Sequence, residues 1–184
     1  MTQFVPYKAL MTDRTLNVLL IGENNTGKSS FMLKVTGKEL LKGYTARDSD
    51  CQQKFINTLS TTQGIITINT HVSTSRTVII KDTKIDGVIL MFSHGNMSSV
   101  SSIGPWLESI DENYADVPII FVLGKIDITV RDTTVNSVIC VSRDMSDIEC
   151  IGISSLFDDN IEEPQLALIR LILDDPTLSI ADKS

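Results

Sequence analysis

The strongest constraint on the fold is the segment at residues 22–29, GENNTGKS, which fits the pattern G-x-x-x-x-G-K-[ST]. An apolar run at residues 16–21 precedes it, and the helix-compatible residues 31–35 follow. Strand, turn and helix therefore succeed one another, as a phosphate-binding loop requires. The alternative is a glycine-rich turn with a chance lysine, but the motif and both flanks agree. The segment predicts that the chain binds a nucleoside phosphate, or that it descends from a chain that did.

Each part of this loop has a chemical task. Its glycines let successive backbone N–H groups point at a phosphate, and the following helix adds the positive end of its dipole. Lys28 would reach the β- and γ-phosphates, and the Ser29 hydroxyl would ligate Mg²⁺. The predicted nucleotide contacts in the loop are Gly22, Asn24, Asn25, Thr26, Gly27, Lys28, Ser29 and Ser30.

Length and composition describe one globular domain. The chain of 184 residues is long enough to bury a core, and its three cysteines lack metal-ligand spacing and cannot all pair. This cysteine usage favours the cytoplasm or nucleus. A net charge of −7 argues against nucleic acid or anionic membrane as a general partner. We expect a single domain over residues 1–184 with flexible ends at 1–14 and 177–184, no lipid anchor, and a monomer.

Short apolar runs alternate with helical patterns along the chain. This alternation is typical of an α/β fold with a mostly parallel sheet and helices on both faces. We expect six strands, at residues 17–21, 65–69, 77–80, 88–92, 119–123 and 148–153.

Three helices are also expected. The first covers residues 28–36 and ends before Gly37. The second carries an apolar stripe in which Pro105 implies a kink or a late start, and the stripe consists of Val100, Ile103, Leu107 and Ile110. The third starts near residues 160–163 and stops at 174–176. Residues 45–63 are polar and show no period, which predicts either a solvated loop or a mobile loop over the nucleotide.

A second motif, G-K-x-D at residues 124–127, follows one of the expected strands, where open α/β sheets place ligand contacts. The Asp127 carboxylate can accept hydrogen bonds from both N1–H and N2–H of guanine, which adenine cannot supply. The stem of Lys125 can cover the base. Ser154 and Ser155 follow a further strand, where backbone N–H groups could meet guanine O6. Each motif alone is a weak signal, but their order after the phosphate loop favours guanine.

In this order the motifs resemble the Ras superfamily of small GTPases, and within it the Ran family of nuclear transport. Residues 36–44 are similar to the Ran segment after the first helix, and Trp106 occupies a tryptophan position of that family. Residues 161–164 and 174–178 resemble the last helix and its exit. The resemblance implies a small-GTPase fold that binds GTP or GDP with Mg²⁺. It also implies nuclear-transport or Ran-regulatory proteins as partners, in the cytoplasm, the nucleus or both.

The guanine motif departs from the family pattern at one position. Gly124 stands where the family's N-K-x-D has an asparagine, which contacts guanine N7 and ties the motif to the phosphate loop. Its loss removes hydrogen bonds of about 1–3 kcal/mol in all. Asp127 and Ser154 match the family, whereas Ser155 and Leu156 replace an Ala-Lys pair. Guanine binding is therefore expected to survive in weakened form.

The hydrolytic machinery departs further. Residues 78–83, VIIKDT, match the strand that leads to the family's D-T-A-G-Q, so Asp82 is expected to hold the outer shell of Mg²⁺. Lys84 and Ile85 then replace Ala-Gly, and the water-orienting glutamine and the second switch segment have no counterpart. Hydrolysis is therefore expected to be weak or absent, and no catalytic residue is assigned.

The first switch and the phosphate loop depart as well. Thr45 is the only nearby candidate for the family's Mg²⁺-binding threonine, and the sequence register around it is ambiguous. Asn24 and Asn25 occupy loop positions where the family usually has glycines, and in that family a side chain at the first of these positions crowds the attacking water and the arginine finger.

Four functions compete on this evidence. The favoured hypothesis is a Ran-like protein that binds GTP or GDP, hydrolyses GTP slowly or not at all, and acts by occupying protein partners. The second is an active GTPase completed by residues 45–63 or by a partner. The third is a pseudo-GTPase interaction module without nucleotide. The last is a kinase, which needs a cationic lid, whereas residues 45–63 contain only Arg47 and Lys54.

Overall fold

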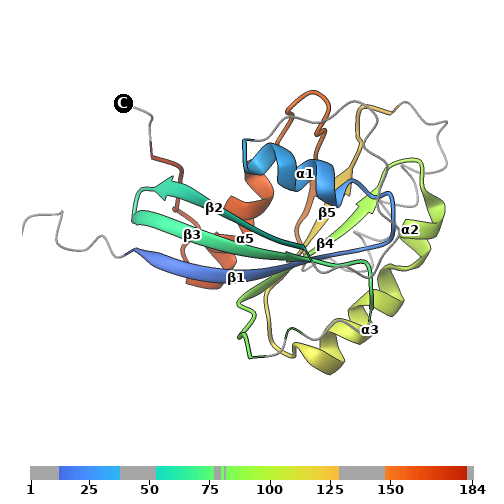
Figure 1. Ribbon diagram of the computed structural model, residues 1–184, viewed down its shortest axis with the longest axis horizontal. Coiled ribbons are helices and arrows are strands. Elements are labelled where there is room, and N and C mark those ends of the chain that lie inside the picture. Colours follow the sequence, from blue (N-terminus) through green and yellow to red (C-terminus); the bar gives the residue numbers. More distant parts are fainter. Residues whose placement is uncertain (1–12, 38–52, 77–79, 81, 129–147, 182–184) are drawn as a thin grey trace, which may run out of the picture.

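The computed structural model describes residues 13–37, 53–76, 80, 82–128 and 148–181. Across these ranges six strands form one sheet in the order β2-β3-β1-β4-β5-β6 (Figure 1). The strand β2 (Gln53–Thr61) pairs antiparallel with β3. All other pairings are parallel, and they join β1 (Arg14–Ile21), β3 (Gly64–Val72), β4 (Gly87–Ser93), β5 (Ile119–Gly124) and β6 (Cys150–Gly152). The mostly parallel six-stranded sheet predicted from the sequence is confirmed.

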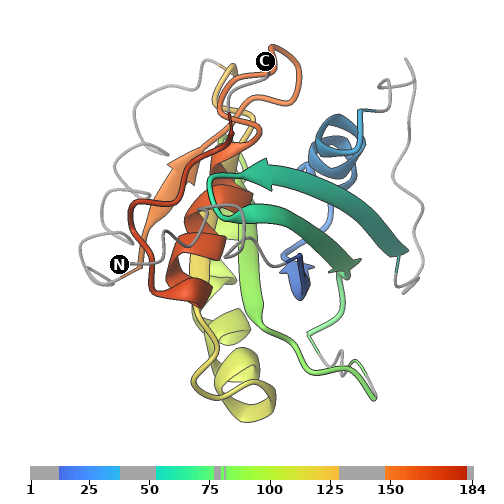
Figure 2. The same ribbon diagram turned by 90° about the vertical axis from the view of Figure 1, so that its left-hand side faces the viewer.

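Helices cover both faces of this sheet. The helices α1 (Lys28–Val35) and α5 (Glu163–Leu173) share one apolar cluster with β1, to which Leu20 contributes. The helices α2 (Met97–Ser101) and α3 (Ile103–Asn113) share a second cluster, to which Leu19 contributes. Successive residues of β1 therefore face opposite layers, as the pleat requires. Figure 2 shows α3 on the opposite side of the sheet from α1.

The sixth strand is not the one that the sequence predicts. Five predicted strands are confirmed with shifted ends, whereas the one predicted at 77–80 lies outside the described residues except for Ile80. The missing member is β2, so the loop predicted for residues 45–63 is wrong at 53–61, and residues 45–52 lie outside the described part. The strand β2 lies at the edge of the sheet, and its exposed positions alternate with partly buried ones. Because one of its faces is polar, its sequence has no continuous apolar run, and the alternation with a period of two was not recognised.

The helices follow the sequence closely. The helix α1 ends as expected before Gly37, which adopts a φ of +69° and donates its N–H to the Lys34 carbonyl. The apolar stripe divides into two helices at Ser102, and Pro105 lies in the first turn of α3, where its missing N–H costs no helical hydrogen bond. Of the two alternatives predicted for Pro105, the late start of the helix is therefore confirmed, and the kink is not. No helix in the described ranges is long and apolar enough to cross a membrane.

The segment after α5 packs against the sheet instead of forming a flexible end. Leu178 is fully buried, and its carbonyl accepts a hydrogen bond from Arg170 Nε at 2.9 Å. Backbone hydrogen bonds then join Ser179 to Thr62 and Ala181 to Ser60, beside the edge of β2. The predicted flexible end is thus wrong for residues 177–181, because this edge strand supplies unpaired backbone groups. Residues 1–12 and 182–184 lie outside the described part.

Candidate nucleotide-binding site

The phosphate loop, residues 22–29, joins the carboxyl end of β1 to the start of α1 (Figure 1). Three of its residues have left-handed backbone angles, with φ of 140° at Gly22, 61° at Asn25 and 106° at Gly27. A side chain on Gly22 is excluded, since its Cβ would lie 2.0 Å from the Met91 carbonyl oxygen. These angles curl the loop in front of the N-terminus of α1, which is the geometry that anions bind.

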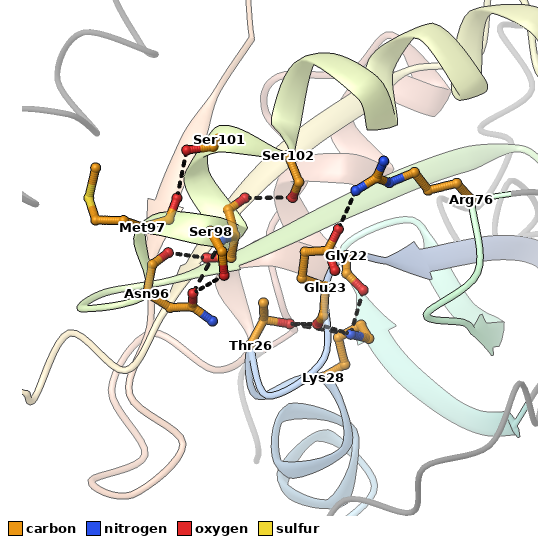
Figure 3. Close-up of polar contacts among 11 residues, drawn as sticks. Gly22, Glu23, Thr26, Lys28, Arg76, Asn96, Met97, Ser98, Ser101 and Ser102 are labelled. Atoms are coloured by element: carbon orange, nitrogen blue, oxygen red, sulfur yellow. Dashed lines mark hydrogen bonds and ion pairs between the residues drawn. The ribbon is translucent and has the colours of Figure 1, made fainter.

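The Lys28 side chain folds back into this loop (Figure 3). Its Nζ donates to the carbonyl oxygens of Gly22 at 2.7 Å and Glu23 at 2.6 Å, and approaches Thr26 Oγ1 at 3.3 Å. The hydroxyl of the buried Thr26 donates to the Glu23 carbonyl at 3.0 Å and closes the turn. Burial lowers the pKa of Lys28 to about 8, although the negative charge of Glu23 acts in the opposite direction. A pre-positioned cation therefore lies inside the loop.

The Glu23 side chain contacts the layer of α3. It pairs with Arg76 at 2.7 Å (Figure 3), and the Arg76 guanidinium lies 5.8 Å from the centre of the Trp106 ring. Burial raises the pKa of Glu23, but polar interactions with Arg76, Ser102 and Trp106 outweigh it, so the pKa lies below its ordinary value. The Arg76 carbonyl also accepts a hydrogen bond from Ser109 of α3. These contacts fix the chain after β3 between the phosphate loop and α3.

The base loop, residues 124–127, meets the phosphate loop at the end of β5. Lys125 Nζ donates to the Asn25 carbonyl at 2.5 Å. The Asp127 carboxylate accepts a hydrogen bond at 2.6 Å from the hydroxyl of Ser154, which is 2% exposed. The structure thus brings together Asn25, Lys125, Asp127 and Ser154. We predicted only a backbone role for Ser154, and no local signal in the sequence indicates that its hydroxyl orients Asp127.

The phosphate loop packs directly on Gly124. A Cβ at this position would lie 2.6 Å from the Thr26 carbonyl oxygen and 2.6 Å from Met91 Cε. Any side chain at position 124 therefore collides with the phosphate loop in its present place. Met91 belongs to a uniformly buried strand and is one of its apolar residues, so the sequence gives no sign that it contacts both loops.

The other residues predicted to contact the nucleotide lie in the phosphate loop, in the first turn of α1 and beside Ser154. Ser29 and Ser30 are partly exposed in the first turn of α1, directly after Lys28. Asn24 is exposed at the tip of the phosphate loop, and Ser155 is partly exposed beside Ser154. Thr45 lies outside the described residues.

The strand next to the phosphate loop is β3, and it extends beyond its predicted end at residue 69. The strand β3 ends at Val72, and the Ser73 N–H donates to the Leu20 carbonyl of β1 at 3.0 Å. The residues that follow β3 beside the phosphate loop are therefore Ser73, Thr74, Ser75 and Arg76. They include no carboxylate and no glutamine.

The structure does not bring Asp82 together with Ser29. Its neighbour Ile80 donates its N–H to the Tyr114 hydroxyl at the end of α3. Asp86 exchanges hydrogen bonds with Asn17, at the end of the sheet where β4 begins. Asp82 lies in the chain between Ile80 and Asp86, and Asp86 is at the end of the sheet where β4 begins, whereas the phosphate loop follows the carboxyl end of β1. The metal role predicted for Asp82 relies on matching residues 78–83 to the strand before the family's second switch, and it stays a prediction because residues 78, 79 and 81 lie outside the described part of the chain.

The described residues offer few protein ligands to a metal ion at this site. Among the described residues no group of three or more His, Cys, Asp or Glu side chains could hold a metal. Mg²⁺ commonly keeps several waters and binds through one or two protein groups together with substrate phosphates. The Ser29 hydroxyl in the first turn of α1 fits that kind of site.

Comparison with protein families agrees with this geometry. A family model described as Ras family matches residues 17–174. The matched range begins within β1 and ends directly after α5, so it contains the phosphate loop, the base loop and Ser154. A search of curated proteins found no match.

Proposed function

This chain belongs to the Ras family of small GTPases, and we propose that it is a guanine-nucleotide-binding protein with weak or absent GTP hydrolysis. The observation that carries the proposal is the junction of the two loops. The Lys125–Asn25 hydrogen bond joins the loop that holds the Lys28 ammonium to the loop that holds the Asp127 carboxylate. One ligand with phosphates at one end and a guanine at the other satisfies both groups.

The residues of the site have distinct tasks. The backbone N–H groups of the phosphate loop and the Lys28 ammonium would hold the phosphates. Ser29 would supply a hydroxyl to Mg²⁺, which neutralises phosphate charge when bound. Asp127, held in place by Ser154, would accept hydrogen bonds from N1–H and N2–H of guanine. Adenine lacks this pair of donors, so Asp127 would select the base.

The residues beside the phosphate loop support the proposal that hydrolysis is weak. The whole connection from β3 to β4, residues 73–86, contains no glutamine to orient an attacking water. Arg76, a cation of this connection beside the loop, is engaged by Glu23. The anchors at Arg76, Ile80 and Asp86 hold this connection through side-chain contacts. A loop held in this way would respond little to a γ-phosphate.

The choice of partner is a further part of the proposal. The Ran-like features at Trp106 and at residues 174–178 support nuclear-transport or Ran-regulatory proteins as partners, in the cytoplasm, the nucleus or both. Trp106 is buried against the sheet, and the Asp175 carboxylate accepts hydrogen bonds from Thr177 at the exit of α5. We propose that the protein acts as a monomer that occupies such a partner.

Titration calorimetry of the nucleotide-stripped protein with GDP, GTP and ATP, with and without Mg²⁺, tests the proposal. We expect heat with GDP and GTP, none with ATP, and no phosphate release from bound GTP. Absence of heat with every nucleotide, while circular dichroism shows a folded protein, would instead indicate an interaction module without nucleotide. Phosphate release that a cell extract accelerates would indicate an active GTPase completed by a partner.

A further inference from the structure

Three glycines of the two nucleotide loops share one neighbour, Met91 of β4. The Met91 carbonyl oxygen lies 2.0 Å from the position of a Cβ on Gly22. Its terminal methyl, Cε, lies 3.2 Å from such a position on Gly27 and 2.6 Å from one on Gly124. Met91 is 1% exposed. The methyl group therefore fills the buried space between the phosphate loop and the base loop.

The contact is close because position 124 has no side chain. The Thr26 carbonyl oxygen approaches the Cβ position of Gly124 to 2.6 Å, so the main chains of the two loops almost touch. Methionine has an unbranched, flexible side chain that fills irregular gaps. On the exposed side the same loops are joined by Lys125 and the Asn25 carbonyl. The two loops are thus joined on both sides, by packing inside and by a hydrogen bond outside.

We propose that Met91 is a positioning residue that sets the phosphate loop against the base loop, by packing where a hydrogen-bonding side chain at position 124 would otherwise join them. The inference rests on the proposed guanine-nucleotide function. According to this inference, Met91 sets the distance between the Lys28 ammonium and the Asp127 carboxylate, and this distance determines whether one ligand fits both groups. Met91 touches no ligand itself and acts only through the loops.

The direct test compares Met91→Ala with Leu90→Ala. Leu90 is the neighbouring residue of β4, equally buried but on the face that packs against α2 and α3. We expect both variants to melt at a lower temperature, because each loses a buried apolar side chain. Only Met91→Ala should also bind GDP about tenfold more weakly, because its loops are no longer held in register. Met91→Leu, which restores most of the volume, should recover most of the affinity.

Affinities are measured by titration calorimetry at a temperature where all variants are folded. GDP binding by Met91→Ala that equals the wild type would overturn the proposal. So would an equal loss of affinity in Leu90→Ala, because that result would make the effect one of general stability.

A second experiment needs no nucleotide. Gly124→Ala is made in the wild type and in Met91→Ala, and the melting temperatures of the four proteins are compared. We expect the alanine to lower the melting temperature less in the Met91→Ala background, since one of its two collisions is removed there. Equal changes in melting temperature in the two backgrounds would overturn the proposal that Met91 packs on Gly124. If the wild type fails to bind GDP, the proposed function fails, and this comparison still decides whether Met91 joins the loops.

Discussion

The phosphate loop and the start of the connection from β3 to β4 lie at the same end of β1, but the two segments are held in different ways. The phosphate loop takes its shape from main-chain angles at Gly22, Asn25 and Gly27 and from carbonyl groups that Lys28 gathers. The connection is held by side-chain contacts of Arg76, at one end, and Asp86, at the other. A nucleotide-holding loop is thus intact beside a connection that lacks the glutamine of a hydrolytic switch. We therefore propose that nucleotide binding and nucleotide sensing are separable in this chain.

The largest expected effect is on the phosphate side. Lys28→Ala removes the buried cation from the phosphate loop, so we expect GDP and GTP to bind at least about a hundredfold more weakly. Lys34→Ala, nearly two helix turns further along α1, is the matched control, because Lys34 pairs with Asp158 away from the loop. Titration calorimetry checks both variants. Equal affinity in Lys28→Ala and the control would mean that the phosphate loop no longer serves a nucleotide.

The base side should lose less. Asp127→Ala removes both guanine contacts and is expected to weaken GDP binding by about ten- to a hundredfold. Ser154→Ala removes only the hydrogen bond that orients Asp127 and should cost roughly fivefold. Competition with ADP provides the readout, because the preference for GDP over ADP should collapse in Asp127→Ala. Unchanged preference would show that some other group selects the base.

A pH series tests whether the Lys28 charge is used. Burial lowers the pKa of Lys28 to about 8 in the free protein, and an adjacent phosphate would raise it again. Binding must therefore take up a proton above pH 8, so GDP affinity should be flat below pH 8 and fall by up to roughly tenfold per pH unit above it. Calorimetry in buffers of different ionisation enthalpy measures this proton uptake. Lys28→Arg, whose guanidinium does not titrate in this range, should abolish the uptake.

The same contrast explains what the sequence could and could not predict. The phosphate loop and Asp127 were predictable because their chemistry lies in short contiguous motifs next to apolar strands. The strand β2 was missed because an edge strand with one solvated face has no continuous apolar run. The predicted strand stopped at residue 69 because Thr70 and His71 are polar, whereas β3 continues to Val72.

Contacts between segments far apart in the chain were beyond prediction. The Glu23–Arg76 pair, the Ser154–Asp127 hydrogen bond and the packing of Met91 on Gly124 each join different elements of the fold. Glutamate, serine and methionine are ordinary residues at their positions, and only tertiary structure places each beside its partner. The sequence therefore indicated which ligand to expect, but gave no indication of how the loops are held together.

The smallest effect is expected from a substitution in the connection from β3 to β4. Arg76→Ala leaves the Glu23 carboxylate unpaired beside the phosphate loop, so GTP should lose more affinity than GDP, by about two- to fivefold, because the pair is partly exposed and screened by solvent. Glu23→Gln combined with Arg76→Ala removes the unpaired charge and should restore the wild-type ratio of the two affinities. Lys84→Ala is the control, since Lys84 is an exposed cation of the same connection that pairs with Asp86.

Dissociation constants for GTP and GDP in the four proteins, measured at low ionic strength where exposed charges act most strongly, give this ratio. If Arg76→Ala and the double variant show the same GTP-to-GDP ratio as the wild type, the role of Arg76 is confined to its packing on Trp106. A ratio that shifts and then recovers would show that the connection still acts on the phosphates through the charge of Glu23. In that case nucleotide binding and the connection are coupled electrostatically, even without a residue that orients water.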